Sequence, residues 1–311
     1  MQKSENDFAL VLLCVKSNIQ ETVKNLGVYQ KFLSPKKIVV IGARELGQFV
    51  PIDGSTSFCD EDTILGGLTL RAVRDEISAI ESLATHRAGW YFQQFLKLSY
   101  AFACKEESYL AWDADTIPLH EVQMIQDGKK LFDVKTEYNE AYFDTIAKIL
   151  PGLKKENDFS FISEHMLFES AIVREMIQKI EDASALPFWK IILRSIEKSR
   201  LQGSAFSEFE TYGTYVTKFY PEKYGIRKWK SFRDEAVFFP NGVSVTDFNK
   251  LGMKYDAKSF ENHESQKKLS RFLGHKIFQN RFFISLFIWA KEGAKKIIMQ
   301  KENRTWAAPR G

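Results

Sequence analysis

The sequence predicts an α/β fold built on a mostly parallel sheet that is flanked by helices. A continuous apolar run at residues 8–15 and the segment Lys-Ile-Val-Val-Ile-Gly at residues 37–42 have the pattern of strands that are buried on both faces. The stretch between them, from Ser17 to about Phe32, is typical of a helix that Ser17 caps. A strand, a helix and a strand within about 35 residues form a βαβ unit, in which the two strands run parallel.

The following segments keep alternating between helix and strand. We expect a short strand that ends near Cys59, a mostly helical stretch over residues 66–103 with a break near Gly89, and a strand at residues 109–112. Later strands are expected at residues 131–136, 159–168 and 229–239, and later helices at residues 170–180, 187–198 and 204–218. Such a fold has a ligand crevice at the carboxyl ends of its strands.

Length and composition exclude several classes of protein. The 311 residues are 44% apolar and 27% charged, ordinary values for a globular chain that can bury a core without disulfides or a metal. The three cysteines lie far apart, which excludes a disulfide scaffold and a clustered-cysteine zinc module and suits a reducing compartment. The sequence also lacks the glycine-rich loops of P-loop and dinucleotide enzymes.

The net charge of +4 is the sum of two regions of opposite sign. Residues 265–311 contain eleven Lys or Arg and two acids, a local charge of +9, so the first 264 residues carry −5. From Arg271 onward, basic residues alternate with bulky apolar ones, which is typical of an amphipathic helix in the plane of an anionic membrane. The alternative is a C-terminal helix that packs on the body. Charge alone would also suit nucleic acid; we expect a membrane surface and no nucleic acid.

The sequence predicts a cytoplasmic protein that associates peripherally with the inner face of the membrane through this basic tail. Residues 1–7 mix charges and do not form a secretory signal. The longest apolar stretch, residues 282–290, has nine residues, whereas a helix that spans a membrane needs about 20.

Asp113 and Asp115 follow the expected strand at residues 109–112. Residues two apart on a strand face the same way, and two carboxylates there offer the hard oxygen ligands that Mg²⁺ and Mn²⁺ prefer. Such an ion can bridge a diphosphate and neutralise the charge on a leaving nucleoside diphosphate. The same spacing occurs at Asp60 and Asp62 in a polar turn. The alternative for Asp113 and Asp115 is helix capping or a solvated strand end.

Five other polar residues are candidates for contact with a phosphorylated ligand. Lys16 and Ser17 follow the first strand, and Arg44 follows the second. Gln94 and Lys97 are polar residues of the helix that precedes Asp113, and its aromatic residues form the apolar face. Lys97 can meet a phosphate there; a solvated helix face is the alternative.

The segment at residues 207–213, Ser-Glu-Phe-Glu-Thr-Tyr-Gly, carries two carboxylates that do not share a helical face. Glu208 or Glu210 can serve as a general base toward an acceptor hydroxyl. The alternative is a helix start in which Ser207 is the cap and Glu210 completes a capping box.

Two of the five histidines are candidates for a third metal ligand or a substrate contact. His165 lies in a strand-like run, and His263 follows residues 259–262 near the end of the predicted body. A structural histidine with satisfied hydrogen bonds is the alternative for each.

Three blocks occur in order along the chain: Gly-Trp-x-x-Gln-Gln-x-x-Lys-Leu at residues 89–98, Tyr-Leu-x-x-Asp-x-Asp-Thr at 109–116 and Ser-Glu-Phe-Glu-Thr-Tyr-Gly at 207–213. Together they resemble a bacterial family of GT-A-type glycosyltransferases, much of it known only as an uncharacterised domain. The resemblance extends from about residue 8 to about residue 264. It departs from the family pattern at Phe209, where members often have Tyr.

The resemblance implies a GT-A-like (Rossmann-like) catalytic domain over residues 1–264, followed by the helical tail at 265–311. Its nucleotide-sugar half would cover about residues 1–150 and its acceptor half about residues 151–264. It implies Mn²⁺ or Mg²⁺ at Asp113 and Asp115, with His263 as a third ligand. Glu208 or Glu210 would be the base of an inverting displacement.

We expect a nucleotide sugar as donor, with a UDP-sugar favoured, and an acceptor that is a glycan or a glycolipid. The acceptor contacts are assigned to His165 and Tyr212. The donor contacts are assigned to Lys16, Ser17, Arg44, Gln94, Lys97 and Asp113.

The predicted function is therefore metal-dependent transfer of a sugar to a bacterial surface glycan, such as lipooligosaccharide, O-antigen or capsule. Two alternatives are open. Paired carboxylates also serve metal-dependent phosphodiester and nucleotidyl enzymes, which turn over without a sugar acceptor. The other alternative is a non-enzymatic protein that binds a membrane surface through residues 271–299 and whose acidic residues are structural.

Overall fold

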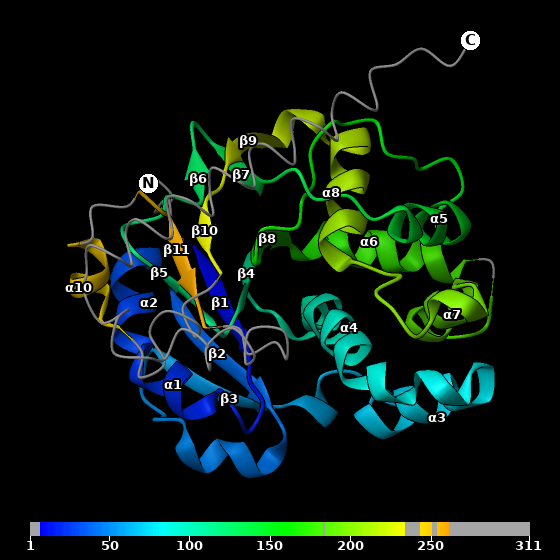
Figure 1. Ribbon diagram of the computed structural model, residues 1–311, viewed down its shortest axis with the longest axis horizontal. Helices are drawn as coiled ribbons and strands as arrows, with labels where there is room; N and C mark the ends of the chain where they lie inside the picture. Colours follow the sequence, from blue (N-terminus) through cyan, green and yellow to red (C-terminus); the bar gives the residue numbers. More distant parts are fainter. Residues whose placement is uncertain (1–6, 183, 234–242, 251–253, 261–311) are drawn as a thin grey trace, which may run out of the picture. The chain divides into compact units, whose positions relative to one another are not determined.

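A computed structural model of the chain describes residues 7–182, 184–233, 243–250 and 254–260 (Figure 1). The chain forms two compact units, Met1–Lys230 and Ser231–Gly311, each of which is described by itself. The first unit extends across residue 150, where the sequence suggests a junction between two halves of one body. The boundary expected at residue 264 lies outside the described residues and stays a prediction.

A mixed, mostly parallel sheet forms the centre of the first unit. In the described part of the chain its order is β3-β2-β1-β4-β8. The strands are β1 Phe8–Leu13, β2 Lys37–Gly42, β3 Thr56–Asp60, β4 Ser108–Asp113 and β8 His165–Glu169. Strands β3, β2, β1 and β4 run parallel, and β8 is antiparallel to β4. The predicted α/β class is therefore confirmed.

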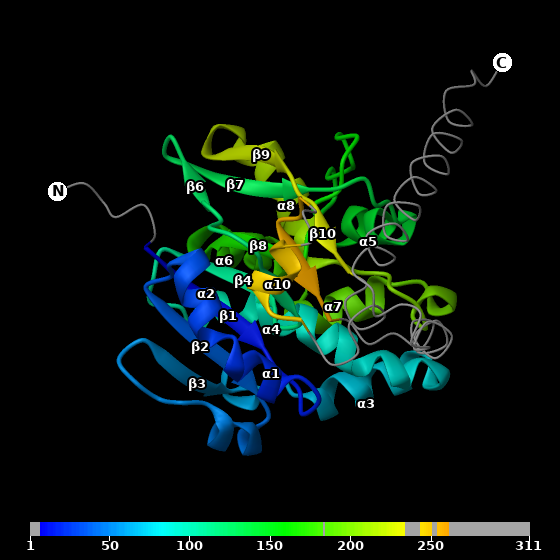
Figure 2. The same cartoon turned by 60° about the vertical axis from the view of Figure 1, so that its left-hand side comes forward.

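Helices cover both faces of this sheet (Figures 1 and 2). Two short helices, α1 Ile19–Lys24 and α2 Leu26–Leu33, connect β1 to β2, whereas α3 Leu70–Ile80 and α4 Ala88–Ala103 lead from β3 to β4. The two connections run in opposite directions along the sheet, so right-handed crossovers place their helices on opposite faces. Strand β1 is buried along its whole length because it has helices on both sides.

Two helical stretches differ from the sequence prediction at their ends. The stretch after β1 forms two helices, and Asn18 rather than Ser17 occupies the cap position of α1. Helix α4 begins at Ala88, next to the break expected near Gly89, but the interruption before it is longer: the backbone is extended at Glu81, between α3 and a 3₁₀ helix at Ser82–Arg87. The Glu81 carboxylate accepts a hydrogen bond from the Leu83 N–H, which satisfies the start of that 3₁₀ helix.

The rest of the first unit forms a smaller sheet and a helical layer. The smaller sheet has the order β6-β7-β9, with β6 Ile125–Gln126, β7 Lys129–Val134 and β9 Tyr224–Lys228, and β5 Thr116–Pro118 follows β4. The helices are α5 Glu140–Ile149, α6 Ser170–Glu181, α7 Phe188–Ser195 and α8 Glu208–Phe219. Short 3₁₀ helices occur at Arg44–Phe49, Glu61–Thr63, Lys198–Arg200 and Pro221–Lys223.

The strand expected at residues 159–168 is shorter in the structure, because β8 begins at His165. Ser160 forms an isolated antiparallel bridge with Lys135 instead of joining the main sheet.

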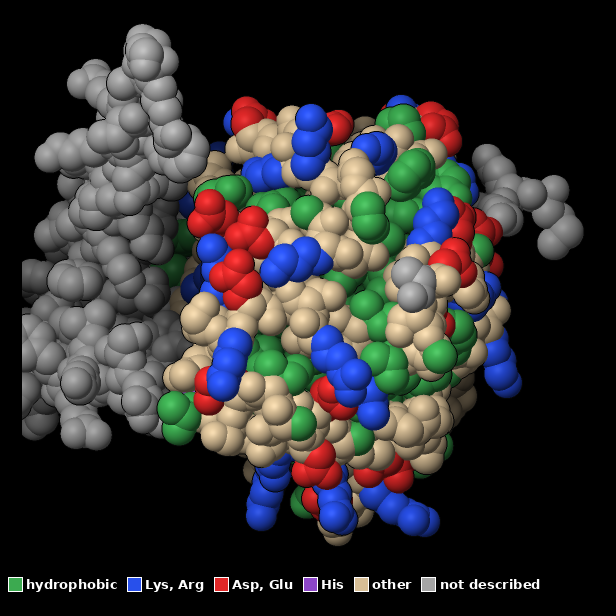
Figure 3. Space-filling model, turned by 90° about the vertical axis from the view of Figure 1, so that its right-hand side faces the viewer, with side chains coloured by type: hydrophobic (Ala, Val, Ile, Leu, Met, Phe, Trp, Pro, Cys, Tyr) green, Lys and Arg blue, Asp and Glu red, His purple; other side chains and the backbone are tan. Residues whose placement is uncertain are grey.

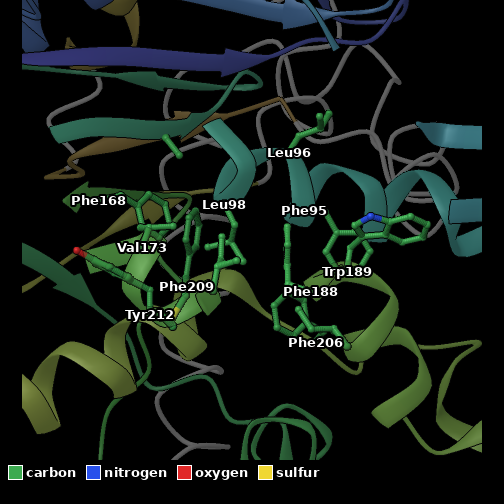
Figure 4. Packing of buried hydrophobic residues seen from close by; sticks show 14 of the residues in the cluster. Phe95, Leu96, Leu98, Phe168, Val173, Phe188, Trp189, Phe206, Phe209 and Tyr212 are labelled. Carbon is green, nitrogen blue, oxygen red and sulfur yellow. The ribbon is translucent and has the colours of Figure 1, made fainter. Parts of the chain in front are cut away.

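Aromatic side chains from α4, α7 and α8 form much of the core (Figure 4). Phe95 of α4 packs edge-on against Phe188 of α7, with 6.0 Å between ring centroids. The centroid of the Phe95 ring also lies 5.9 Å from that of Phe206, which precedes α8. Tyr212 of α8 lies 4.7 Å from Phe168 of β8. This packing fixes the start of α8 against α4 and β8, and so determines which side chains meet at the end of β4.

The second unit is described at residues 231–233, 243–250 and 254–260. Strand β10 Ser231–Phe232, which falls in the strand expected at 229–239, pairs in parallel with β11 Ala257–Ser259. Helix α10 Val245–Asn249 lies between these two strands in the sequence. Its Phe248 packs with Phe232 and Tyr255 in an aromatic cluster.

Both His263 and the basic tail lie outside the described residues. Among the helices that are described, none is long and apolar enough to cross a membrane.

Candidate functional site

The carboxyl ends of neighbouring parallel strands meet at one edge of the main sheet. Leu13 of β1 is in register with Ile41 of β2 on one side and with Asp113 of β4 on the other. Gly42 of β2 is opposite Asp60 of β3. Residues 16–17, 42–44 and 113–115, which we expected to share an edge, all follow from these strand ends.

Lys16, Ser17 and Arg44 are exposed beyond this edge. A Cβ at Gly42 would lie 2.8 Å from the carbonyl oxygen of Cys14, so glycine is needed for the close approach of β2 to the end of β1. Their role in donor binding stays a prediction.

Asp113 and Asp115 flank Ala114, whose backbone is held by hydrogen bonds. Asp113 ends β4, but Asp115 lies in the turn before β5, so the argument from strand geometry does not extend to Asp115. The carbonyl oxygen of Ala114 accepts hydrogen bonds from the hydroxyls of Thr22 on α1 and Tyr29 on α2, each at 3.2 Å. The two helices thus fix the turn that carries both carboxylates.

A buried lysine connects Asp113 to the start of α8. The Nζ atom of Lys97 lies 2.8 Å from Oδ1 of Asp113 and 2.8 Å from Oε1 of Glu208. The ammonium group also lies over the Phe209 ring, 4.3 Å from its centroid. The side-chain amide of Gln94, oriented with its nitrogen toward Glu208, donates to the same carboxylate. Four residues from three distant blocks therefore form one cluster.

This cluster contains buried charged groups; its members are Lys97, Asp113, Glu208 and Gln94. Burial alone would lower the pKa of Lys97, but the two carboxylates outweigh burial and raise it, so the lysine stays protonated. Burial raises the pKa of Glu208, and Lys97 opposes that shift. Lys97 is 6% exposed, whereas the Asp113 side chain is 37% exposed. Asp113 is therefore the carboxylate of the cluster that a cation from solvent can reach.

Glu210 has different surroundings from Glu208. Its Oε1 accepts hydrogen bonds from the Ser160 hydroxyl and, at 3.2 Å, from the Phe161 N–H. Its Oε2 is buried and has no hydrogen-bond partner in the described part of the chain, and burial raises its pKa. The Ser207 hydroxyl caps α8 by accepting from the Glu210 N–H, which is one half of the expected capping box. Glu210 therefore anchors the segment before β8.

Glu208 and Glu210 are each 1% exposed, so neither carboxylate reaches solvent. A general base must lie within hydrogen-bond reach of the acceptor hydroxyl. The geometry thus gives no support to the base that we expected at these positions, and that role stays a prediction.

The two residues expected to contact an acceptor are enclosed. Nε2 of His165 lies 2.7 Å from Oδ2 of Asp133, and its ring stacks on Trp112 with 4.3 Å between centroids. The hydroxyl of Tyr212 bonds to that of Tyr224 at 2.6 Å, inside the core. Both side chains are buried, so the geometry gives no support to a direct acceptor contact. Nδ1 of His165 has no hydrogen-bond partner in the described part of the chain, so the alternative of a fully satisfied structural histidine is not met either. The acceptor role of both residues stays a prediction.

The carboxylates of Asp113 and Asp115 are the hard oxygen ligands that Mg²⁺ and Mn²⁺ prefer, and the metal site expected there stays a prediction. Lys97 occupies Oδ1 of Asp113, which leaves coordination to Oδ2. Within residues 7–182, 184–233, 243–250 and 254–260, no group of three or more His, Cys, Asp and Glu is placed to hold a metal. Mg²⁺ commonly keeps several waters and binds through one or two carboxylates plus substrate phosphates. A site built on two aspartates would therefore take its other ligands from substrate phosphates and water.

Sequence reasoning missed the residues that hold Asp113 from the side of β8. The backbone N–H of Asp113 donates to the carbonyl oxygen of Glu164 at 2.8 Å. The Glu164 carboxylate in turn accepts from Lys135 and, at 3.1 Å, from Nε1 of Trp229. A charged residue just before an apolar strand was the one sequence signal, and it does not identify its partners.

Comparison with known proteins gives a family and a distant structure. Residues 11–236 match the model described as "Family of unknown function (DUF6492)". A search of curated proteins finds no match. Among solved structures, mouse xyloside xylosyltransferase 1 in its apo form is similar, with 10% sequence identity and a TM-score of 0.37 over 73% of this chain and 87% of that one. A likeness this distant carries no argument about the reaction.

Proposed function

The chain belongs to DUF6492, a family whose function is unknown, and we propose that it is a metal-dependent glycosyltransferase with a GT-A-like site. One observation carries the proposal. The blocks at residues 89–98, 109–116 and 207–213 each contribute to the cluster of Lys97, Asp113 and Glu208 at the carboxyl edge of a mostly parallel sheet. Ligands of open α/β sheets bind at this edge.

The proposed metal site uses Oδ2 of Asp113 together with Asp115. When bound, Mn²⁺ or Mg²⁺ would supply neutralisation of the charge that develops on the leaving nucleoside diphosphate. Lys97 and Gln94 orient Asp113 and Glu208 in this proposal, instead of contacting the donor directly. The exposed side chains of Lys16, Ser17 and Arg44 contact the nucleotide sugar, with a UDP-sugar favoured.

The proposed acceptor is a glycan or glycolipid of a bacterial surface, reached at the inner face of the membrane. The charge of +9 over residues 265–311 supports the membrane part of the proposal. On the face of the first unit seen in Figure 3, basic and acidic side chains are interspersed, which does not attract an anionic surface. The base that takes the acceptor proton is left unassigned, because Glu208 and Glu210 are buried.

Turnover of a UDP-sugar by an Asp115→Asn variant tests the proposal. We expect the metal-dependent transfer or hydrolysis of the donor to fall by about 100-fold or more, since the ion supplies several kcal/mol of transition-state stabilisation. Asp62→Asn is the matched control, because Asp60 and Asp62 form the other Asp-x-Asp pair. Full turnover in a folded Asp115→Asn protein would contradict the proposal. Turnover of a phosphodiester without any sugar would favour the alternative enzyme class.

A further inference from the structure

Glu164 binds the backbone of Asp113, and it does so from a backbone conformation that glutamate rarely adopts. Its φ angle is 66°, in the left-handed region that residues with a side chain rarely adopt. In this conformation its carbonyl oxygen accepts the Asp113 N–H at 2.8 Å. That bond extends the β4–β8 ladder one step past the last pair, Trp112 and His165.

Two donors fix the Glu164 side chain. The indole Nε1 of Trp229 donates to Oε2 at 3.1 Å, and the Lys135 ammonium group binds Oε1. Both Glu164 and Trp229 are buried. The carboxylate therefore has little freedom to leave, and neither does the backbone that carries it.

Trp229 is itself held against both strands that flank Asp113. Its ring lies edge-on to Trp112 of β4, at 6.0 Å and 89°, and to His165 of β8, at 4.5 Å and 70°. Its backbone N–H donates to the carbonyl oxygen of Val134 at 3.2 Å. One indole thus contacts the residue before Asp113, the residue after Glu164 and the Glu164 carboxylate.

We propose that Glu164 is a positioning residue for Asp113 and that Trp229 keeps Glu164 in place. Backbone strain persists only where the surroundings over-determine it, and it concentrates at functional sites. We use the word latch for two hydrogen bonds that Glu164 joins. Trp229 Nε1 donates to Glu164 Oε2, and the Asp113 N–H donates to the Glu164 carbonyl oxygen. The latch fixes the position at which β4 ends. Its effect on ligand binding rests on the proposed function, but the latch itself does not.

Trp229→Phe is the sharpest variant, because it keeps a ring and removes the indole N–H. Trp189→Phe is the matched control: Trp189 is also buried, and its Nε1 has no hydrogen-bond partner among the described residues. The first readout is hydrogen exchange of the Asp113 amide, which needs no ligand. We expect about tenfold faster exchange in Trp229→Phe, the effect of losing one hydrogen bond to a charged group, and no change in Trp189→Phe.

Glu164→Gly is a second variant that tests the side chain separately. Glycine adopts a φ of 66° without strain, so a purely local conformational preference predicts unchanged or slower exchange at Asp113. The latch predicts faster exchange, because the carboxylate that Trp229 and Lys135 hold is gone. Unchanged exchange at Asp113 in folded Trp229→Phe and Glu164→Gly proteins would overturn the latch.

Calorimetry of UDP binding with Mn²⁺ separates the latch from the proposed function. We expect the affinity of Trp229→Phe to fall by about tenfold and that of Trp189→Phe to stay at the wild-type value. Faster exchange with an unchanged UDP affinity would overturn the positioning role. Faster exchange in a protein whose wild type binds no nucleotide would support the latch and contradict the proposed function.

Discussion

Two carboxylates on the first turn of α8 differ in the charge of their hydrogen-bond donors. Glu208 pairs with the buried cation of Lys97, whereas Glu210 accepts from the neutral Ser160 hydroxyl and the Phe161 N–H. Glutamine has nearly the shape of glutamate and no charge. The same substitution at the two positions therefore separates a charge role from a hydrogen-bonding role.

Glu208→Gln is expected to lower the free energy of unfolding by about 2–4 kcal/mol, because it removes one of the two partners of a buried lysine. Glu210→Gln is expected to change it by about 1 kcal/mol or less, since the Ser160 hydroxyl and the Phe161 N–H are neutral donors that an amide oxygen can also accept. Urea unfolding at pH 7 measures both. Equal losses in the two variants would contradict the assignment of the charge role to Glu208.

A double-mutant cycle measures the Lys97–Glu208 pair directly. Lys97→Met leaves two carboxylates side by side, and we expect a loss of about 3–5 kcal/mol. Adding Glu208→Gln should recover part of that loss, with a coupling energy of about 1–3 kcal/mol. Strictly additive effects would show that the two groups do not interact in solution.

For single residues, the sequence identifies candidates but does not predict how they are arranged in space. Spacing and block order selected Gln94, Lys97, Asp113 and Glu208, and the structure brings these four together. Whether a carboxylate is exposed or ion-paired depends on contacts across more than 100 residues. The burial of Glu208 was therefore beyond sequence reasoning.

Helix α8 passes so close to the segment before β8 that one position has no room for a side chain. A Cβ at Gly213 would overlap the ring of Phe161, which is buried. Gly89 on α4 is the opposite case, since nothing lies within 4 Å of a Cβ placed there.

Gly213→Ala is expected to destabilise the protein by about 1–3 kcal/mol, because the Phe161 ring must shift. Gly89→Ala is expected to stabilise it by about 0.5–1 kcal/mol through helix propensity and a less flexible unfolded chain. Thermal melts of the two variants make the comparison. A stable Gly213→Ala protein would show that α8 and the 159–164 segment are not in contact as described.

One buried carboxylate joins β7, β8 and β9. Oδ2 of Asp133 lies 2.7 Å from His165 Nε2, and Arg227 donates to both carboxylate oxygens, at 2.5 and 2.7 Å. Burial would raise the pKa of Asp133, but the hydrogen bonds from Arg227 and His165 outweigh it and lower the pKa. A lowered pKa in the folded state contributes stability that is present above the unfolded pKa, about 4, and is lost as the pH falls through the folded pKa.

Asp133→Asn is therefore expected to cost about 2–4 kcal/mol at pH 7 and progressively less below about pH 4. Denaturant unfolding at a series of pH values between 7 and 3 measures the difference from the wild type. A difference that grows on acidification would contradict the sign of the Asp133 shift.

Elements were predictable where apolar runs are continuous. The strands β1, β2 and β4 lie where the sequence predicts strands, because helices on both faces require side chains that are apolar on both faces. The sequence predicts that residues 159–164 are part of a strand. In the structure, however, the Phe161 N–H bonds to Glu210 and Ser160 forms a bridge with Lys135, so the segment does not join the main sheet. Partners that far away leave no local periodicity.

For the whole molecule, the two regions of opposite charge suggest that attachment and chemistry are separate. The prediction for the tail comes from sequence alone, because residues 261–311 are outside the described part of the chain. Deletion of residues 271–299 should abolish co-sedimentation with anionic phospholipid vesicles, and added salt should weaken the binding of the intact chain. Vesicle binding that survives the deletion would remove the tail from the account.

The α/β class and the edge of the sheet that carries Asp113 followed from the sequence. The latch that links Trp229 through Glu164 to Asp113 did not, since neither Trp229 nor Glu164 belongs to a motif. Residues that act through position instead of chemistry leave no pattern to search for, and they were found only once β4, β8 and β9 were placed together.

The central claim is that the edge at Asp113 and Asp115 is a metal-dependent site for a nucleotide sugar. Calorimetric titration of UDP, GDP and CMP with and without Mn²⁺, on the wild type and on Asp115→Asn, tests it most directly. We expect that one nucleoside diphosphate, UDP by preference, binds only with the metal and that Asp115→Asn abolishes this binding without lowering the melting temperature. Nucleotide binding that ignores both the metal and the substitution, or no binding to the folded wild type, would contradict it.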